Sequence, residues 1–201
     1  MKKAVQNMVL LFLACAVSFG QSLSAADREK GIQYLEKTRD GVIAATKGLS
    51  EAQWNFKPAP DRWSVAETLE HIVVTENYLF QMVTDQVMKS PAGAPDRDVA
   101  KLDELVVARI SDRSHKAKAP PPVVPKGRWS PSETLDRFLQ TRAKTIAYLQ
   151  SAPDLRDHVM NSPIQQPLDG YEWLLYIGAH SERHTKQILE VKADANFPKK
   201  Q

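Results

Sequence analysis

Hydrophobic residues recur with a helical period along most of the chain, and proline-rich stretches separate the periodic segments. The clearest period covers residues 64–89, where apolar side chains from Val65 to Val87 fall on one stripe at 100° per residue. Similar patterns predict helices over residues 27–47, 130–149 and 171–192, and a shorter helix over 98–113. No segment shows the alternation typical of a strand. The sequence therefore predicts an all-α chain with four main helices, joined by loops long enough for crossover connections.

Prolines mark the expected connectors. Residues 49–62 and 151–169 read as loops that link one helix to the next. The run Pro120-Pro121-Pro122, followed by Pro125, predicts a stiff, extended segment over residues 117–126. The sequence assigns this segment no role.

Two helix starts share a short repeat. Residues 62–69 match residues 128–135, and each copy places a Trp before a Ser-x-x-Glu capping box, in which the N-cap residue and the residue three positions later bond each other's backbone. The boxes pair Ser64 with Glu67 and Ser130 with Glu133, so capping is the simplest role for both glutamates. The copies differ at His71, which aligns with Arg137. Only the first copy therefore offers a metal ligand.

The N-terminus has the three parts of a secretory signal peptide. Two lysines follow Met1, residues 8–19 are almost continuously apolar, and small residues at 22–26 allow cleavage after Ala25 or Ala26. The apolar run is too short for a stable membrane span, which takes about 20 residues. Residues 1–25 are thus predicted to be a signal peptide, followed by one helical domain over 27–195. This predicts a secreted or periplasmic protein with no stable membrane span after cleavage.

Two alternatives compete at this end of the chain. Lipid attachment at Cys15 would follow an unusually short apolar run, and a buried first helix would lack any polar face between Val9 and Phe19. Cys15 is the only cysteine, so an intramolecular disulfide is excluded, and the mature chain has no thiol of its own.

Charge argues against a nucleic-acid partner. Basic residues number 27 and acidic residues 24, a net charge of +3, and two of these positive charges belong to the predicted signal. Both signs are mixed along the remainder, without the basic stripe that phosphate contacts require. Hydrophobic residues make up 42% and charged residues 25% of the chain, as in globular proteins.

The histidines are the candidate chemical groups. His180 and His184 are four residues apart, so their rings project from one face of the last helix. That face also carries Trp173, Ile177 and Ile188, within roughly 60° of one another, and is predicted to be buried. Two buried imidazoles need partners, and a shared divalent cation would provide one for both. The pattern is not the His-Glu-x-x-His of a metalloprotease, because Glu182 comes one position late and points away.

His71 is the candidate third ligand. It lies roughly 140° from the main apolar stripe of its helix, which on its own would expose it to solvent. A second, narrower stripe combines His71 with Thr75, Tyr78 and Met82, and predicts that this side also meets a neighbouring helix. His115 lies in a polar connector and is expected at the surface, as is His158.

Two stretches resemble the DinB/YfiT-like superfamily. Residues 49–79, centred on Trp63-Ser64-Val65-Ala66-Glu67-Thr68-Leu69-Glu70-His71-Ile72, are similar to the superfamily's second-helix signature. Residues 172–188, with both histidines and the following Gln187, resemble its last-helix signature. The resemblance implies a four-helix bundle with crossover connections. It also implies a divalent metal, zinc or nickel, held by His71, His180 and His184.

A site of this kind suggests a metal-dependent hydrolase or transferase that acts on an unidentified small molecule. Three histidines leave a tetrahedral metal one open position, where a bound water or thiolate would be the reacting group. No side chain stands out as a general base. Export disfavours thiol transfer, because the small thiols used by some members belong to the cytoplasm. A non-catalytic exported metal or small-molecule binder, and a metal-free core cluster of histidines, stay open as alternatives. A homodimer is neither required nor excluded.

Overall fold

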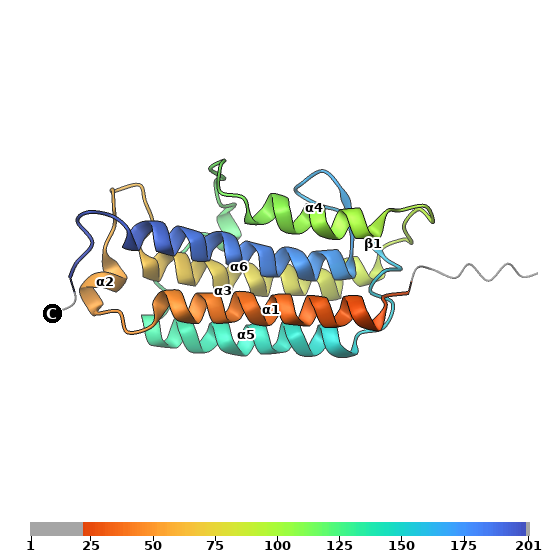
Figure 1. Cartoon of the computed structure of the whole chain (residues 1–201), viewed down its shortest axis with the longest axis horizontal. Coiled ribbons are helices and arrows are strands. Elements are labelled where there is room, and N and C mark those ends of the chain that lie inside the picture. The colour runs from red at the N-terminus through yellow and green to blue at the C-terminus, as the bar shows by residue number, and fades with distance from the viewer. Residues whose placement is uncertain (1–21, 200–201) are drawn as a thin grey trace, which may run out of the picture.

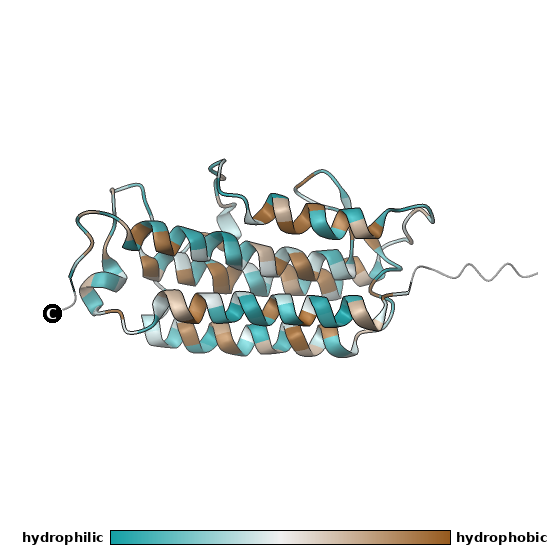
Figure 2. Ribbon diagram, viewed as in Figure 1, coloured by the Kyte–Doolittle hydropathy of each residue, from teal (hydrophilic) through white to brown (hydrophobic). Residues whose placement is uncertain are grey.

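The structure, a computed structural model, describes residues 22–199. Its core consists of four long helices lying side by side along the long axis of the molecule: α1 (Ala25–Thr46), α3 (Val65–Asp85), α5 (Pro131–Ser151) and α6 (Gly170–Lys192) (Figure 1). Hydrophobic and hydrophilic residues alternate around each of them (Figure 2). The expected four-helix bundle is confirmed. Most of the predicted signal peptide, residues 1–21, lies outside the described part of the chain.

The helices are connected in an unusual order around the bundle. Going round, α1 packs on α6, α6 on α3, α3 on α5 and α5 on α1. Helices α3 and α5 both start at the same end of the molecule, so the chain between them must return along its full length (Figure 1). That return contains α4 (Val99–Ser111), which packs outside the bundle on α6. The predicted crossover connection is thus present.

Shorter elements depart from the prediction. The connector 49–62 holds a short helix, α2 (Glu51–Asn55), and α3 is followed by a 3₁₀ turn, η1 (Val87–Lys89). The prolines at 120–122 lead into a second 3₁₀ turn, η2 (Pro121–Val123), instead of a fully extended segment. The described residues therefore form six α-helices.

A small hairpin contradicts the expectation of no strands. Strand β1 (Val159–Asn161) pairs antiparallel with β2 (Pro167–Asp169) in the predicted loop 151–169, with Met160 opposite Leu168. Each strand has only three residues, too few for a period of two to be recognised. The hairpin leads directly into the N-terminus of α6.

Side-chain caps define the helix starts. The predicted capping boxes, Ser64 with Glu67 and Ser130 with Glu133, are both formed. A third box joins Asp169 to Glu172 at the start of α6. Helix α1 is capped by Ser24, whose hydroxyl accepts from the backbone N–H of Asp27. Cleavage after Ala25 or Ala26 would remove this cap.

The core has two hydrophobic clusters. One surrounds the N-terminal half of α6, and the other lies toward its C-terminal end. Each cluster takes residues from α1, α3, α5 and α6, in that order: the first includes Leu35, Leu79, Ile146 and Ile177, and the second includes Val42, Ile72, Phe138 and Ile188. Among residues 22–199, no helix is both long and apolar enough to cross a membrane.

A buried ion pair between the two clusters is hydrogen-bonded to polar groups of the other two long helices. The guanidinium of Arg142 on α5 is fully buried and pairs with Glu76 on α3 through bonds of 2.8 and 2.9 Å. It also donates to the Leu35 carbonyl and the Thr38 hydroxyl on α1, and to the Ser181 hydroxyl on α6. We call Arg142 and these four partners the arginine hub. A buried pair with fully matched hydrogen bonds fixes which helices meet and at which height.

Candidate metal centre

Helix α6 contributes two of the three candidate ligands. His180 and His184 lie one turn apart, and their ring centroids are 4.4 Å apart. His184 is buried and His180 half-buried. The predicted buried face is confirmed, since Trp173, Ile177 and Ile188 on the same side are all at most 1% exposed.

Helix α3 brings the third ligand to the same place. His71 is 3% exposed, and its ring centroid lies 4.5 Å from that of His184 and 4.9 Å from that of His180. One ring nitrogen from each histidine can be chosen so that all three lie within 4.8 Å of one another. The structure thus joins the three residues that the sequence singled out. The second stripe on α3 is buried at His71 and Thr75, but Tyr78 is 48% exposed, so the burial expected of this stripe does not extend to that residue.

Hydrogen bonds behind the rings set their orientation. Nδ1 of His71 lies 2.7 Å from the carbonyl oxygen of Val123, and Nδ1 of His184 lies 2.9 Å from Oε1 of Gln187. Both acceptors require a proton on Nδ1, which leaves the Nε2 lone pair of each ring unprotonated. Metal-binding histidines commonly have such a partner on the far nitrogen.

The Nε2 atoms of His71 and His180 are 3.2 Å apart. Two nitrogen ligands of a tetrahedral zinc ion, each about 2.0–2.1 Å from the metal, lie roughly 3.3 Å apart. A hydrogen bond donated by His180 to His71 has the same length. The spacing therefore fits a shared cation and also fits a metal-free pair.

Burial favours the neutral, metal-binding form of the three rings. It lowers the pKa of His180 and of His184 well below the ordinary value, and the neighbouring histidines add to this effect. The pKa of His71 is lowered by burial too, although its bond to Val123 opposes the shift. The lone pairs are consequently available at neutral pH.

A polar chain extends outward from His184. Oε1 of Gln187 also accepts from Nη1 of Arg113 at 3.2 Å, and Arg113 makes two bonds of 2.7 Å to Glu190. Gln187 thus holds the His184 ring from one side while Arg113 holds Gln187.

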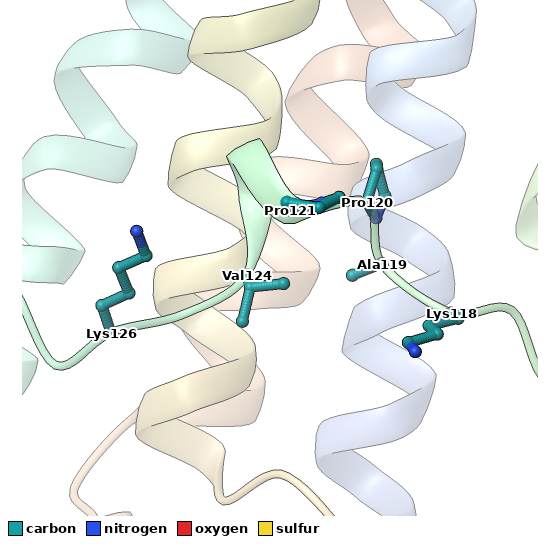
Figure 3. A pocket seen from close by; sticks show the side chains of 6 residues that line it. All are labelled: Lys118, Ala119, Pro120, Pro121, Val124 and Lys126. Atoms are coloured by element: carbon teal, nitrogen blue, oxygen red, sulfur yellow. The ribbon is translucent and has the colours of Figure 1, made fainter.

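The proline-rich segment 117–126, here called the strap, passes over α3 and α6 (Figure 3). Val123, within the strap, is buried and supplies the carbonyl that contacts His71. Residues of the strap line an open pocket of about 560 Å³: Lys118, Ala119, Pro120, Pro121, Val124 and Lys126 (Figure 3). The strap is thereby placed next to the histidine cluster.

In both copies of the repeated helix start, the Trp ring contacts the side chain eight positions later. The Trp63 ring lies 4.7 Å from the His71 ring, and the Trp129 ring lies 4.5 Å below the guanidinium of Arg137, the residue aligned with His71. Each Trp therefore supports the side chain eight positions later. In the first copy, that support also reaches the candidate centre, since Trp63 is 6.4 Å from His184.

The two other histidines lie elsewhere. His115 is exposed, as expected. His158 is half-buried, so its prediction as a surface residue is wrong; its Nδ1 donates to the Ser90 carbonyl at 2.6 Å and ties the hairpin region to the end of η1.

Sequence patterns missed the residues behind the cluster. Val123 acts through its backbone, which no side-chain pattern reveals. Glu70, which accepts hydrogen bonds from the backbone of residues 126–128, was given no role by the sequence. Its position directly before His71 was the available signal.

Comparison with known proteins identifies the family. The family model of the DinB superfamily matches residues 34–188. YuaE of Bacillus subtilis (strain 168), described as uncharacterized, is 28% identical over 148 residues, covering 73% of this chain and 87% of YuaE. YfiT from Bacillus subtilis, described as a probable metal-dependent hydrolase with an unusual four-helix bundle topology, shares the fold with a TM-score of 0.54 at 17% identity, covering 89% of this chain and 93% of YfiT. The resemblance of the two helix motifs is thus confirmed, and the chain belongs to the DinB superfamily.

Proposed function

We propose that this protein binds one divalent cation through His71, His180 and His184 and uses it as a hydrolase or transferase of small molecules. The observation that carries the proposal is that three ring nitrogens, from two helices far apart in the sequence, lie within 4.8 Å of one another. Imidazole donors suit zinc and nickel, which are the cations we expect. The description of YfiT as a probable metal-dependent hydrolase supports the same class of function.

The chain's own groups would prepare the centre. The Val123 carbonyl and the Gln187 amide hold two rings with Nε2 directed inward, and the Trp63 ring covers the cluster from the side. A cation held by these three nitrogen donors would keep a position free for substrate and would act there as a Lewis acid on a substrate oxygen or sulfur.

Metal analysis tests the proposal directly. Untagged protein should contain, or take up, one Zn²⁺ or Ni²⁺ per chain, measured by elemental analysis and calorimetric titration. His71→Ala should weaken binding by at least about 100-fold, beyond the 10–100-fold typical of losing a group behind a ligand. His115→Ala is the matched control and should bind as the wild type does. Protein without stoichiometric metal and without binding would contradict the proposal and favour a hydrogen-bonded histidine cluster.

Turnover then separates an enzyme from a binder. Zinc- and nickel-loaded protein would be assayed against panels of esters, amides and thiol conjugates. Turnover lost in His71→Ala and kept in His115→Ala would support the catalytic proposal. Tight binding with no turnover on any panel would leave a non-catalytic metal-binding protein.

We also propose export, on the sequence pattern of the first 25 residues alone. N-terminal sequencing of protein recovered from the periplasm or medium should begin at Ala26 or Asp27. Recovery of the chain in the cytoplasm with Met1 retained would contradict export.

A further inference from the structure

The carboxylate of Glu70 holds one end of the strap. Its side chain is 4% exposed, and it accepts bonds from the backbone N–H groups of Lys126 at 2.9 Å, Gly127 at 2.8 Å and Arg128 at 3.3 Å. The Arg128 guanidinium binds the same carboxylate. Gly127 has φ +66°, a left-handed conformation that lets successive N–H groups converge on one anion. Glu70 is thus fully engaged by the strap and the two residues after it.

The next residue on α3 holds the strap at a second point. The Nδ1 proton of His71 is donated to the carbonyl of Val123, and Val123 is only 3% exposed. Lys126 follows Val123 by three positions, so these anchor points are at most about 10 Å apart along the chain. Pro125 between them fixes one backbone dihedral and stiffens the link. A shift at Glu70 is therefore transmitted to the carbonyl behind His71.

We propose that Glu70 is a positioning residue for the metal centre. By fixing the strap, it keeps the Val123 carbonyl on His71 Nδ1 and so keeps His71 Nε2 directed toward the histidines of α6. The inference rests on the proposed function. Glu70 acts through the strap, because its oxygens are occupied by the donors of residues 126–128.

Cation binding at His71 and docking of the strap on α3 are then coupled, and coupling is reciprocal. A cation held by His71 stabilises the strap in its docked position, and the docked strap raises the affinity for the cation. Trypsin reports docking, since Lys118 and Lys126 lie on the strap (Figure 3). Zinc should slow cleavage after both lysines.

Glu70→Gln is the decisive variant, because the amide keeps the size of the side chain but offers one acceptor fewer and no charge. Asp136→Asn is its control: Asp136 occupies the position of Glu70 in the second repeat copy and is exposed. Zinc affinity, measured by competition with a chelating dye, should fall about 10-fold or more in Glu70→Gln, as for other groups behind a ligand. Asp136→Asn should leave it unchanged.

Two further readouts distinguish positioning from a general loss of structure. In Glu70→Gln, zinc should no longer protect Lys118 and Lys126 from trypsin, and the ¹⁵N ring shifts of His71 should lose the pure Nδ1–H pattern. Gly127→Ala provides a second variant, since a Cβ there meets nothing within 4 Å and only strains the backbone. It should change the same readouts in the same direction.

The outcomes separate this inference from the proposed function. Wild-type protein that binds neither Zn²⁺ nor Ni²⁺ would overturn both. Wild-type protein that binds zinc with the affinity of a folded Glu70→Gln variant would overturn the role of Glu70 alone. If Glu70→Gln fails to fold, unchanged zinc affinity and unchanged protection in Gly127→Ala would overturn it as well.

Discussion

Arg142→Met tests whether the arginine hub holds the bundle together. The side chains of Arg142 and Glu76 are 0% and 1% exposed, so the substitution leaves a buried carboxylate without its counter-charge. Removing one partner of a buried ion pair costs about 3–5 kcal/mol. The Leu35 carbonyl keeps one donor, the Thr38 hydroxyl at 3.1 Å, so the loss should fall near the middle of that range, about 4 kcal/mol. In a chain of this size, the melting temperature should drop by about 8–16 °C.

Urea unfolding followed by far-UV circular dichroism would measure the loss. Lys144→Met is the matched control on the same helix, exposed to solvent, and should change stability by less than about 0.5 kcal/mol. The double variant Arg142→Met/Glu76→Leu removes both charges and should recover most of the loss, because apolar replacements of buried pairs are often neutral. A loss under about 1 kcal/mol in Arg142→Met, or strictly additive effects in the double variant, would refute the reasoning.

Three other outcomes are expected. Gln187→Ala should weaken zinc binding about 10-fold in a dye competition, because it removes the acceptor behind His184; unchanged affinity would argue against that role. Burial and the charge of Asp169 raise the pKa of Glu172 to about 7 from its ordinary 4.5, so the folded state keeps a proton that the unfolded state has lost. The contribution of Glu172 to stability should therefore fall as pH rises from about 4.5 to about 7. In Glu172→Gln, the free energy of unfolding measured in urea should decrease less between pH 5 and 8 than in the wild type. Zinc at 100 times its dissociation constant should stabilise the protein by about 2.7 kcal/mol, seen as a melting temperature higher by roughly 5–11 °C; a zinc-independent melting curve would contradict binding.

The sequence predicted the helix starts correctly where interactions between residues close in sequence determine them. The capping boxes at Ser64 and Ser130 need only residues three apart, and both formed as predicted. The hairpin around Met160 did not follow, because its pairing depends on packing against the end of the bundle. Arg142 was missed for a related reason: on its helix, a charged residue normally indicates the solvent side, and only Glu76 on another helix allows its burial.

The candidate site was predictable in part. His180 and His184 lie on a face whose apolar neighbours already indicated burial. The angle of His71 on α3 alone favoured solvent, and the second stripe with Thr75 and Met82, together with the family resemblance, indicated that it faces a neighbouring helix. The supports of the cluster depend on a backbone carbonyl and on a loop that returns from far along the chain, neither of which leaves a side-chain period.

The arginine hub has a consequence for the candidate metal centre when no cation is bound. It fixes α3 and α6 at one relative height through side chains other than the three histidines, so the frame around the candidate ligands does not depend on a bound ion. Chelated protein should accordingly stay folded and ready for reloading. Any cation that the proposed centre binds would then be an exchangeable component, and its identity would follow from what the compartment supplies.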